Sequence, residues 1–168
     1  MNINSISSLA HTEGESFWFL GTVMTLKASA ETTGGAFSLI EQSAPVGFAP
    51  PRHIHHAEDE AFYILEGEVT FFAGEQTISA SAGSYIYLPR NIPHSFLVEG
   101  SSPVRLLQWS YPAGIEKFFV ELGTSTSSAV LPPPASPEMT QQAIQALLAL
   151  APEYQLEIVG PPPVPKAR

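Results

Sequence analysis

Apolar and aromatic residues between positions 16 and 112 fall into short runs with a period close to two. The runs cover 17–20, 23–28, 36–41, 61–65, 69–72, 85–88, 95–98 and 105–111. Gly, Pro, Ser and Asn separate them at the spacing of about 8–12 residues that is typical of a β-sandwich or barrel. The pairs Glu66-Gly67 and Ala73-Gly74 resemble hairpin turns. The pattern therefore predicts an all-β, antiparallel domain.

The pattern changes after residue 122. Residues 123–136 are rich in Ser, Thr and Pro, which is typical of a linker. Residues 137–151 are predicted to form a helix, because Ser136 can cap it, Pro137 suits its first turn, and apolar residues recur near the helical period. Residues 153–159 can form a further short strand or an extended segment. We expect an extension (1–15), a barrel (16–122), the linker, the helix and an extended Pro-rich tail (152–168).

The composition narrows the possible partners. The chain has 168 residues, no cysteine, five histidines, seven Lys and Arg and a net charge of -9. Cysteine-based zinc sites, disulfides and a thiol nucleophile are excluded. Nucleic acid is not an expected partner, because phosphate contacts need Lys and Arg. With no apolar run approaching 18 residues and no signal-like N-terminus, we expect no membrane partner and a cytoplasmic protein.

Four of the five histidines lie in two short windows. In the first, His53 and His55 are two residues apart, so on a strand both rings project from one face. Glu60 shares a face with Phe62 and Ile64, and an unpaired carboxylate buried there would cost several kcal/mol. A cation bound beside Glu60 would explain a carboxylate on this apolar face.

The second window contributes His94, which follows the turn 89–93. Pairing of the two windows would bring His94 toward the first cluster. Three imidazoles and a carboxylate suit one divalent transition metal per chain, which can be Fe, Mn, Ni, Co, Cu or Zn. We expect His56 to be exposed or to orient a ligand, and His11 to be solvated. Glu58 and Asp59 are expected in a solvated turn, although either could orient a ligand histidine.

The two windows resemble the paired motifs of the cupin superfamily. Gly47, His53, His55, Glu60 and Gly67 match the first motif, G-x5-H-x-H-x4-E-x6-G. Gly83, Pro89 and His94 match the second, G-x5-P-x-G-x2-H-x3-N, whereas Asn91 replaces its Gly and Val98 its Asn. Asn tolerates a left-handed backbone, so the turn can still form. The resemblance implies a jelly-roll (double-stranded β-helix) barrel and four metal ligands: His53, His55, Glu60 and His94.

A narrower resemblance spans most of the chain and includes the segments at 17–21, 33–37, 51–56, 58–63 and 111–119. These segments are similar to single-domain cupins of the quercetin 2,3-dioxygenase-like group. This implies an oxygenase that cleaves a flavonol, or a related phenolic or enolisable substrate, with O2. Glu60 would be the catalytic base. The residues expected to shape the substrate pocket are Phe48, Phe62, Ile64, Phe96, Val98 and Trp109, although each aromatic could equally be core.

Other functions remain open at this point. The same ligands could serve an isomerase, a decarboxylase or another dioxygenase, because a fold hosts many chemistries. A non-catalytic small-molecule-binding barrel is the third possibility, but such a barrel need not keep Glu60. A homodimer is also expected, in which the N-terminal aromatic strand and the C-terminal helix cover barrel edges of a neighbour.

Overall fold

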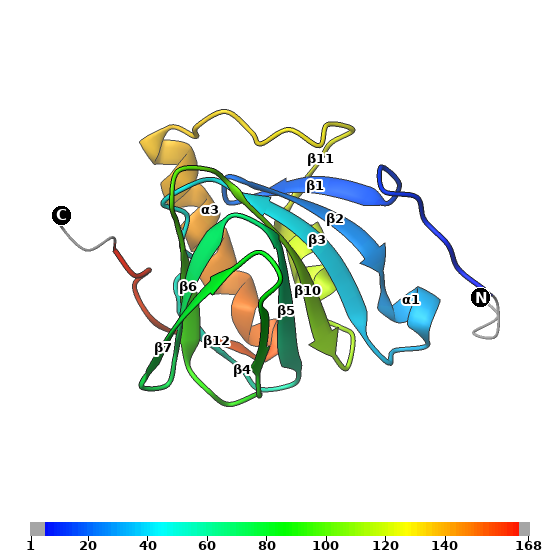
Figure 1. Ribbon diagram of the computed structural model, residues 1–168, viewed down its shortest axis with the longest axis horizontal. Coiled ribbons are helices and arrows are strands. Elements are labelled where there is room, and N and C mark those ends of the chain that lie inside the picture. The colour runs from blue at the N-terminus through cyan, green and yellow to red at the C-terminus, as the bar shows by residue number, and fades with distance from the viewer. Residues whose placement is uncertain (1–5, 165–168) are drawn as a thin grey trace.

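Two antiparallel sheets face each other in the computed structural model, which describes residues 6–164 (Figure 1). The larger sheet has the strand order β11-β1-β2-β3-β10-β5-β8. Its strands are β1 (Glu15–Phe19), β2 (Thr22–Ala28), β3 (Ser38–Ala44), β5 (Asp59–Glu66), β8 (Tyr85–Leu88), β10 (Val104–Tyr111) and β11 (Thr124–Ser125). The smaller sheet has the order β12-β4-β9-β6-β7. Its strands are β4 (Arg52–His55), β6 (Glu68–Ala73), β7 (Gln76–Ser81), β9 (His94–Glu99) and β12 (Leu156–Gly160).

The main core lies between the two sheets. Strand β3 alternates strictly between buried and half-buried residues, as a strand with one face on a core should. Ile64, Phe71 and Leu106 are fully buried there, and each contributes about 1.5–3 kcal/mol by leaving water. The predicted all-β jelly-roll fold with a C-terminal helix is confirmed.

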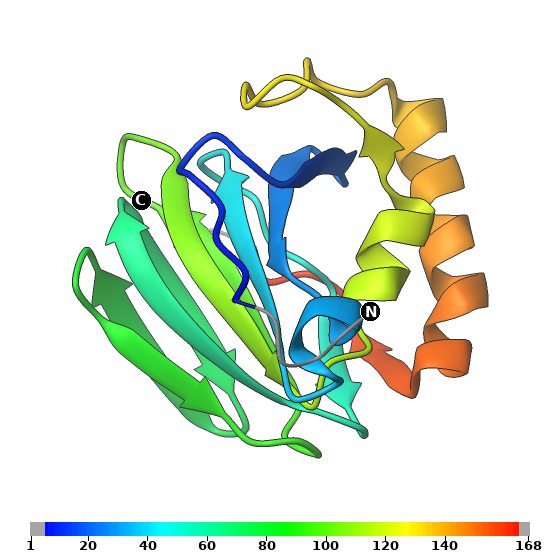
Figure 2. The same cartoon turned by 90° about the vertical axis from the view of Figure 1, so that its right-hand side faces the viewer.

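A second apolar cluster lies between the larger sheet and the helices. Helix α2 (Glu116–Leu122) and helix α3 (Pro137–Leu150) lie together on one side of the molecule, with the strands beside them (Figure 2). Phe19 of β1 packs edge-on against Phe118 and Phe119 of α2, with ring centroids 6.2 Å and 5.3 Å apart. Leu147 of α3 joins the same cluster. The helical layer thus closes one side of the barrel.

Helix α3 begins where the sequence predicts. The Ser136 hydroxyl accepts a hydrogen bond from Met139 N at 3.3 Å, and Pro137 occupies the first turn. Of its apolar residues only Leu147 is buried, whereas Met139 and Ile144 are exposed. The 3-10 turn η1 (Ala151–Tyr154) follows and leads into β12.

Several elements differ from the expected ones. Helix α1 (Ala30–Thr33), helix α2 and strand β7 were not predicted. The apolar run Phe118-Phe119-Val120 has no clear helical period, and four of the six residues of β7 (QTISAS) are polar. Part of the expected linker forms β11, which pairs with β1. Strand β12, by contrast, is the short strand that the sequence allows over residues 153–159, and it pairs with β4. Over residues 6–164, no helix is long and apolar enough to cross a membrane.

Candidate metal centre

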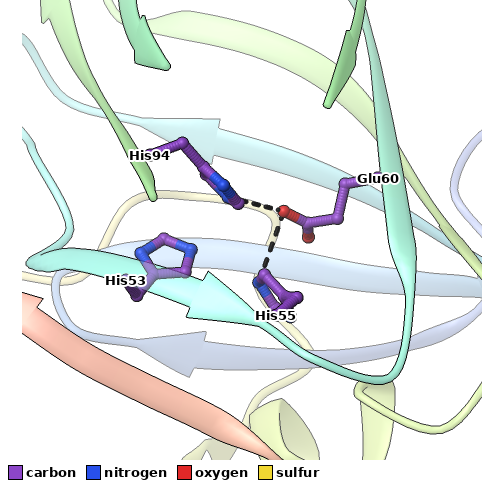
Figure 3. A group of neighbouring side chains, drawn as sticks. All are labelled: His53, His55, Glu60 and His94. Atoms are coloured by element: carbon purple, nitrogen blue, oxygen red, sulfur yellow. Dashed lines mark hydrogen bonds and ion pairs between the residues drawn. The ribbon is translucent and has the colours of Figure 1, made fainter. Parts of the chain in front are cut away.

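Three strands bring four potential ligands together inside the barrel. Strand β4 carries His53 and His55, β5 carries Glu60, and β9 carries His94. His53 and His94 are directly paired across β4 and β9. One ligand atom from each of the four residues lies within 4.8 Å of the others (Figure 3). The structure therefore unites the residues that the sequence proposes as ligands.

Two turns hold these strands in register. Asn91 has a left-handed backbone with φ 65°, and its N–H donates to the carbonyl of His55 at 2.8 Å. Gly67, which ends the first motif, has φ 84°, and a Cβ there would lie 2.8 Å from Pro103 O. Glycine avoids both the strain and the clash. Asn91 makes the turn for which the family pattern has glycine.

The hydrogen bonds of His53 and His94 fix their tautomers. His53 Nδ1 lies 2.7 Å from Pro51 O, and His94 Nδ1 lies 2.9 Å from Ile92 O. A carbonyl can only accept, so each Nδ1 carries the proton and each neutral ring keeps a lone pair on Nε2. Both rings are thus prepared to bind a cation through Nε2.

His55 is held by a buried carboxylate. Its Nδ1 is hydrogen-bonded to Glu58, which is 3% exposed. The expected solvated turn is wrong for Glu58, because the chain folds this side chain inward beneath His55. The alternative, in which Glu58 orients a ligand histidine, matches the observed contact.

Glu60 is ionised in this environment. Its Oε2 lies 3.0 Å from His94 Nε2 and 3.3 Å from His55 Nε2. Burial alone would raise the pKa of Glu60, but the charges of His55 and His94, with the His94 hydrogen bond, lower it to about 2. Its Oε1 accepts a hydrogen bond from Gln108 Nε2 at 2.6 Å. An amide N–H so close to a carboxyl oxygen favours the charged form.

The imidazoles respond to the same cluster in opposite ways. Burial, with His94 and His55 nearby, lowers the pKa of His53 to about 3, so this ring is neutral. Burial also opposes the charging of His55, but Glu60 and Glu58 outweigh it and raise the pKa of that ring. Protons and a cation would therefore compete most directly at His55.

A divalent cation fits these donors. If the rings are neutral, the Nε2 lone pairs of His55 and His94 point at a carboxylate oxygen, which is repulsive. A cation among them would turn this repulsion into ligation, and three imidazoles with one carboxylate suit first-row divalent metals.

An apolar cavity of about 60 Å³ adjoins the four residues. Phe48, Phe62 and Phe96 of the expected pocket line it, and Phe96 packs against Phe48 with ring centroids 5.9 Å apart. Ile64 and Val98 instead lie in the core between the sheets and do not line the cavity. Trp109 lies on the outer side of β10, because the alternate residues Gln108 and Ser110 are the buried ones.

The cavity also has walls that sequence reasoning missed. The helical layer and β12 contribute Phe118, Phe119, Leu147, Leu156 and Ile158. No local sequence signal predicts their approach to the histidines. The sequence could have predicted Gln108 as a residue that faces the cavity, because it follows Val104 and Leu106 on the inward face of β10.

The remaining candidates lie outside the cluster. His56 is exposed, with Nδ1 2.7 Å from Asn91 Oδ1 and Nε2 2.9 Å from Glu157 Oε2. Asp59 forms an ion pair with Arg90 at 2.9 Å rather than contacting a histidine. His11 is exposed, as expected.

Comparisons with known proteins agree with this geometry. Residues 40–110 match the family model of the cupin domain. The chain is 27% identical over 139 residues to a quercetin 2,3-dioxygenase of Bacillus subtilis (strain 168). The aligned region covers 83% of this chain and 41% of that protein. It is 31% identical over 111 residues to a quercetin 2,3-dioxygenase of Aspergillus japonicus, covering 61% of this chain and 31% of that protein.

The chain thus spans less than half the length of either dioxygenase. Among solved structures, a predicted oxalate decarboxylase of Thermotoga maritima superposes with a TM-score of 0.57 at 21% identity, covering 63% of this chain and 99% of that one. At this identity the likeness concerns the fold alone.

Proposed function

The chain belongs to the cupin superfamily and resembles quercetin 2,3-dioxygenases, and on that basis we propose that it is a metal-dependent cupin oxygenase. Its substrate in this proposal is a flavonol or a related phenolic or enolisable molecule, with O2 as co-substrate. The observation that carries the proposal is the convergence of His55 Nε2 and His94 Nε2 on the ionised Glu60.

His53, His55, Glu60 and His94 would hold one divalent transition metal. Such a metal supplies Lewis-acid chemistry, which lowers the pKa of an enol or phenol oxygen. The proposal leaves open which of Fe, Mn, Ni, Co, Cu or Zn is used, because this donor set accepts them all.

Glu60 is the proposed proton acceptor. It is a buried carboxylate at the edge of the cavity, so it can accept the hydrogen bond and then the proton of a substrate hydroxyl. Gln108 holds Oε1 at 2.6 Å and keeps the carboxylate plane fixed. Phe48, Phe62 and Phe96 would pack against the apolar part of the substrate and keep water away.

The cavity volume favours a second candidate, a cupin enzyme for a smaller substrate. About 60 Å³ is well below the roughly 300–1,000 Å³ of typical ligand pockets. A three-ring flavonol would require Leu147, Leu156 and Ile158 to move aside. A small enolic acid or diketone would need little movement, and its enzyme could be an isomerase, a decarboxylase or another dioxygenase.

The test separates metal binding from substrate choice. We expect purified protein to contain close to one divalent transition metal per chain by elemental analysis. It should consume O2 with flavonols, and Glu60→Gln should abolish this while circular dichroism stays unchanged. Absence of metal, even after incubation with each candidate ion, would refute the site.

Turnover only with small enolic substrates would favour the second candidate. Tight binding of these compounds without turnover would instead indicate the non-catalytic binding barrel.

A further inference from the structure

Two buried glutamines line the cavity beside the four potential ligands. Over residues 6–164, the polar lining consists of the cluster and these two residues, namely His53, His55, Glu60, His94, Gln42 and Gln108. Gln42 of β3 and Gln108 of β10 are 2% and 6% exposed. Holding Glu60 uses only the side-chain nitrogen of Gln108, so the metal centre does not explain either amide oxygen.

A chain of hydrogen bonds fixes which end of the Gln42 amide faces the cavity. Thr22 Oγ1 donates its one hydrogen to Phe19 O at 2.7 Å, because a carbonyl can only accept. Toward Gln42 Nε2, 3.3 Å away, the same hydroxyl oxygen can therefore only accept. The nitrogen of the amide must face Thr22, so Gln42 Oε1 points to the other side.

The amide of Gln108 is oriented by the same kind of contact. Its nitrogen donates to Glu60, whose ionised carboxylate can only accept, so Gln108 Oε1 lies on the opposite side. Within residues 6–164, neither glutamine Oε1 accepts a hydrogen bond, although no fully buried side-chain nitrogen or oxygen of this part of the chain lacks a partner. The two oxygens must therefore border open space, and the cavity is the space that both residues line.

The two glutamines continue the polar line of the metal centre along the inner face of the larger sheet. Leu106 of β10 pairs with Gln42, and Gln108 lies two residues further along β10 on the same face. The glutamines are thus diagonal neighbours, with Cα atoms about 7–8 Å apart. Gln108 contacts Glu60 directly, whereas Gln42 lies one strand further across the sheet.

The oxygens at this end of the cavity are hydrogen-bond acceptors. An amide oxygen accepts from a hydroxyl or an N–H group but repels a carboxylate. Within residues 6–164, no Lys or Arg lines the cavity, and the ionised Glu60 adds negative charge. An anionic group held away from the metal would therefore be buried without a counter-charge, which is strongly unfavourable.

We propose that Gln42, together with Gln108, selects neutral substrates that carry a hydroxyl group on the side remote from the metal. The proposal rests on the metal-dependent function above, because one oxygen of the substrate is taken to bind at the four ligands. The remote hydroxyl donates to Gln42 Oε1, and Gln108 Oε1 accepts from a hydroxyl nearer the metal. Substrates with a methyl or carboxylate group in place of the remote hydroxyl should bind less tightly.

Unbranched hydroxamates test this preference by binding alone, without turnover. A hydroxamate binds a divalent metal through its two oxygens, and a slim chain suits a cavity of about 60 Å³. Three probes share the same spacer and end in a hydroxyl (3-hydroxypropionohydroxamate), a methyl (butyrohydroxamate) or a carboxylate (succinomonohydroxamate). The first two have equal numbers of non-hydrogen atoms, so they differ chiefly in the hydroxyl. Their affinities for the Zn²⁺-loaded full chain are measured by isothermal titration calorimetry.

We expect the wild type to bind the hydroxyl probe about 3–10-fold more tightly than the methyl probe, and the carboxylate probe least tightly. The factor is modest because water satisfies the amide oxygens in the free protein. Gln42→Met keeps the side-chain length without the acceptor and should abolish the preference. Gln42→Asn withdraws the amide by one methylene and should lose most of it. Circular dichroism and zinc content should stay unchanged, because Thr22 keeps its hydrogen bond to Phe19 O.

The matched control is Met24→Leu. Met24 pairs with Gln42 across β2 and β3 and also lines the cavity. This change alters the shape of the cavity but removes no acceptor, so it should shift the affinities of the hydroxyl and methyl probes together. A ratio that changes as much as in Gln42→Met would assign the preference to shape and overturn the proposal.

The remaining outcomes separate this proposal from the proposed function. Equal wild-type affinities for the hydroxyl and methyl probes would overturn the proposal, as would a preference that survives in Gln42→Met or zinc-loaded protein that binds no probe. Protein that takes up no Zn²⁺ would refute the metal centre and the selection by Gln42 with it. A protein that keeps the hydroxyl preference but consumes no O2 would instead refute only the oxygenase function.

Discussion

Removal of the Glu58 carboxylate should weaken metal binding although Glu58 is not itself one of the four ligands. Glu58 and His55 are 3% and 2% exposed, and their hydrogen bond fixes the ring whose Nε2 faces the cluster. In Glu58→Ala the backbone should stay in place, because Asn91 N still holds His55 O at 2.8 Å. The loss is then confined to the orientation and basicity of one ring. Residues in this role typically contribute about 10–100-fold in metal affinity, which corresponds to roughly 1.4–2.7 kcal/mol.

The assay is competition for Zn²⁺ or Ni²⁺ between the protein and a chelator of known affinity. Glu58→Gln keeps an acceptor but not the charge, so its affinity should lie between those of wild type and Glu58→Ala. Asp59→Asn is the matched control, because this neighbouring carboxylate pairs with Arg90 instead of a histidine. Equal affinities for Glu58→Ala and Asp59→Asn would refute the reasoning.

Two further predictions concern the supports of the cluster, and a third concerns the ion pair of Asp59 beside it. Gln108→Leu leaves Glu60 Oε1 buried without its donor and should lower the free energy of unfolding by about 1–3 kcal/mol in urea titrations; an unchanged midpoint would contradict this contact. Asn91→Gly should be nearly as stable as wild type because Gly accepts φ 65°, whereas Asn91→Val should lose about 1–2 kcal/mol more; equal melting temperatures would show that this turn relaxes. Hydrogen bonds from Arg90 lower the pKa of Asp59 from 3.8 to about 2, so its stabilising effect should be complete above about pH 4 and fall as the pH approaches 2. Thermal unfolding of wild type and Asp59→Asn should therefore differ at neutral pH and converge at low pH; a difference that grows with acid would have the wrong sign.

The β-barrel could be predicted from the sequence because the patterns that indicate it extend over only a few residues. Alternating burial along β3 and β10 follows from the period of two, and the same period places His53 and His55 on one face. The spacing of the two histidine windows then proposes the ligand set before any contact is known. Asn91 at the turn was also predictable, since Asn is one of the few residues other than Gly that adopts a left-handed backbone readily.

The residues that surround the four potential ligands could not be predicted from local sequence in the same way. Glu58 differs from Asp59 by one position, yet Glu58 lies buried against His55 and Asp59 lies against Arg90. Local sequence cannot distinguish them, because the difference depends on which side of the β4–β5 connection meets the core. Helix α2 was missed for a similar reason, since Phe118 and Phe119 are buried by contact with β1, about 100 residues earlier in the chain.

The sequence by itself determined the β architecture, the position of α3 and the four residues proposed to hold a metal. These features depend on side-chain periodicity, caps and motif spacing, which act over a few residues. Only the tertiary structure decided that α2, α3 and β12 close the cavity to about 60 Å³, that Gln108 and Glu58 support the cluster, and that Gln42 lines the cavity with its amide held by Thr22. These features depend on which distant segments pack together, and that choice is made by the free energy of the whole fold rather than by any local pattern.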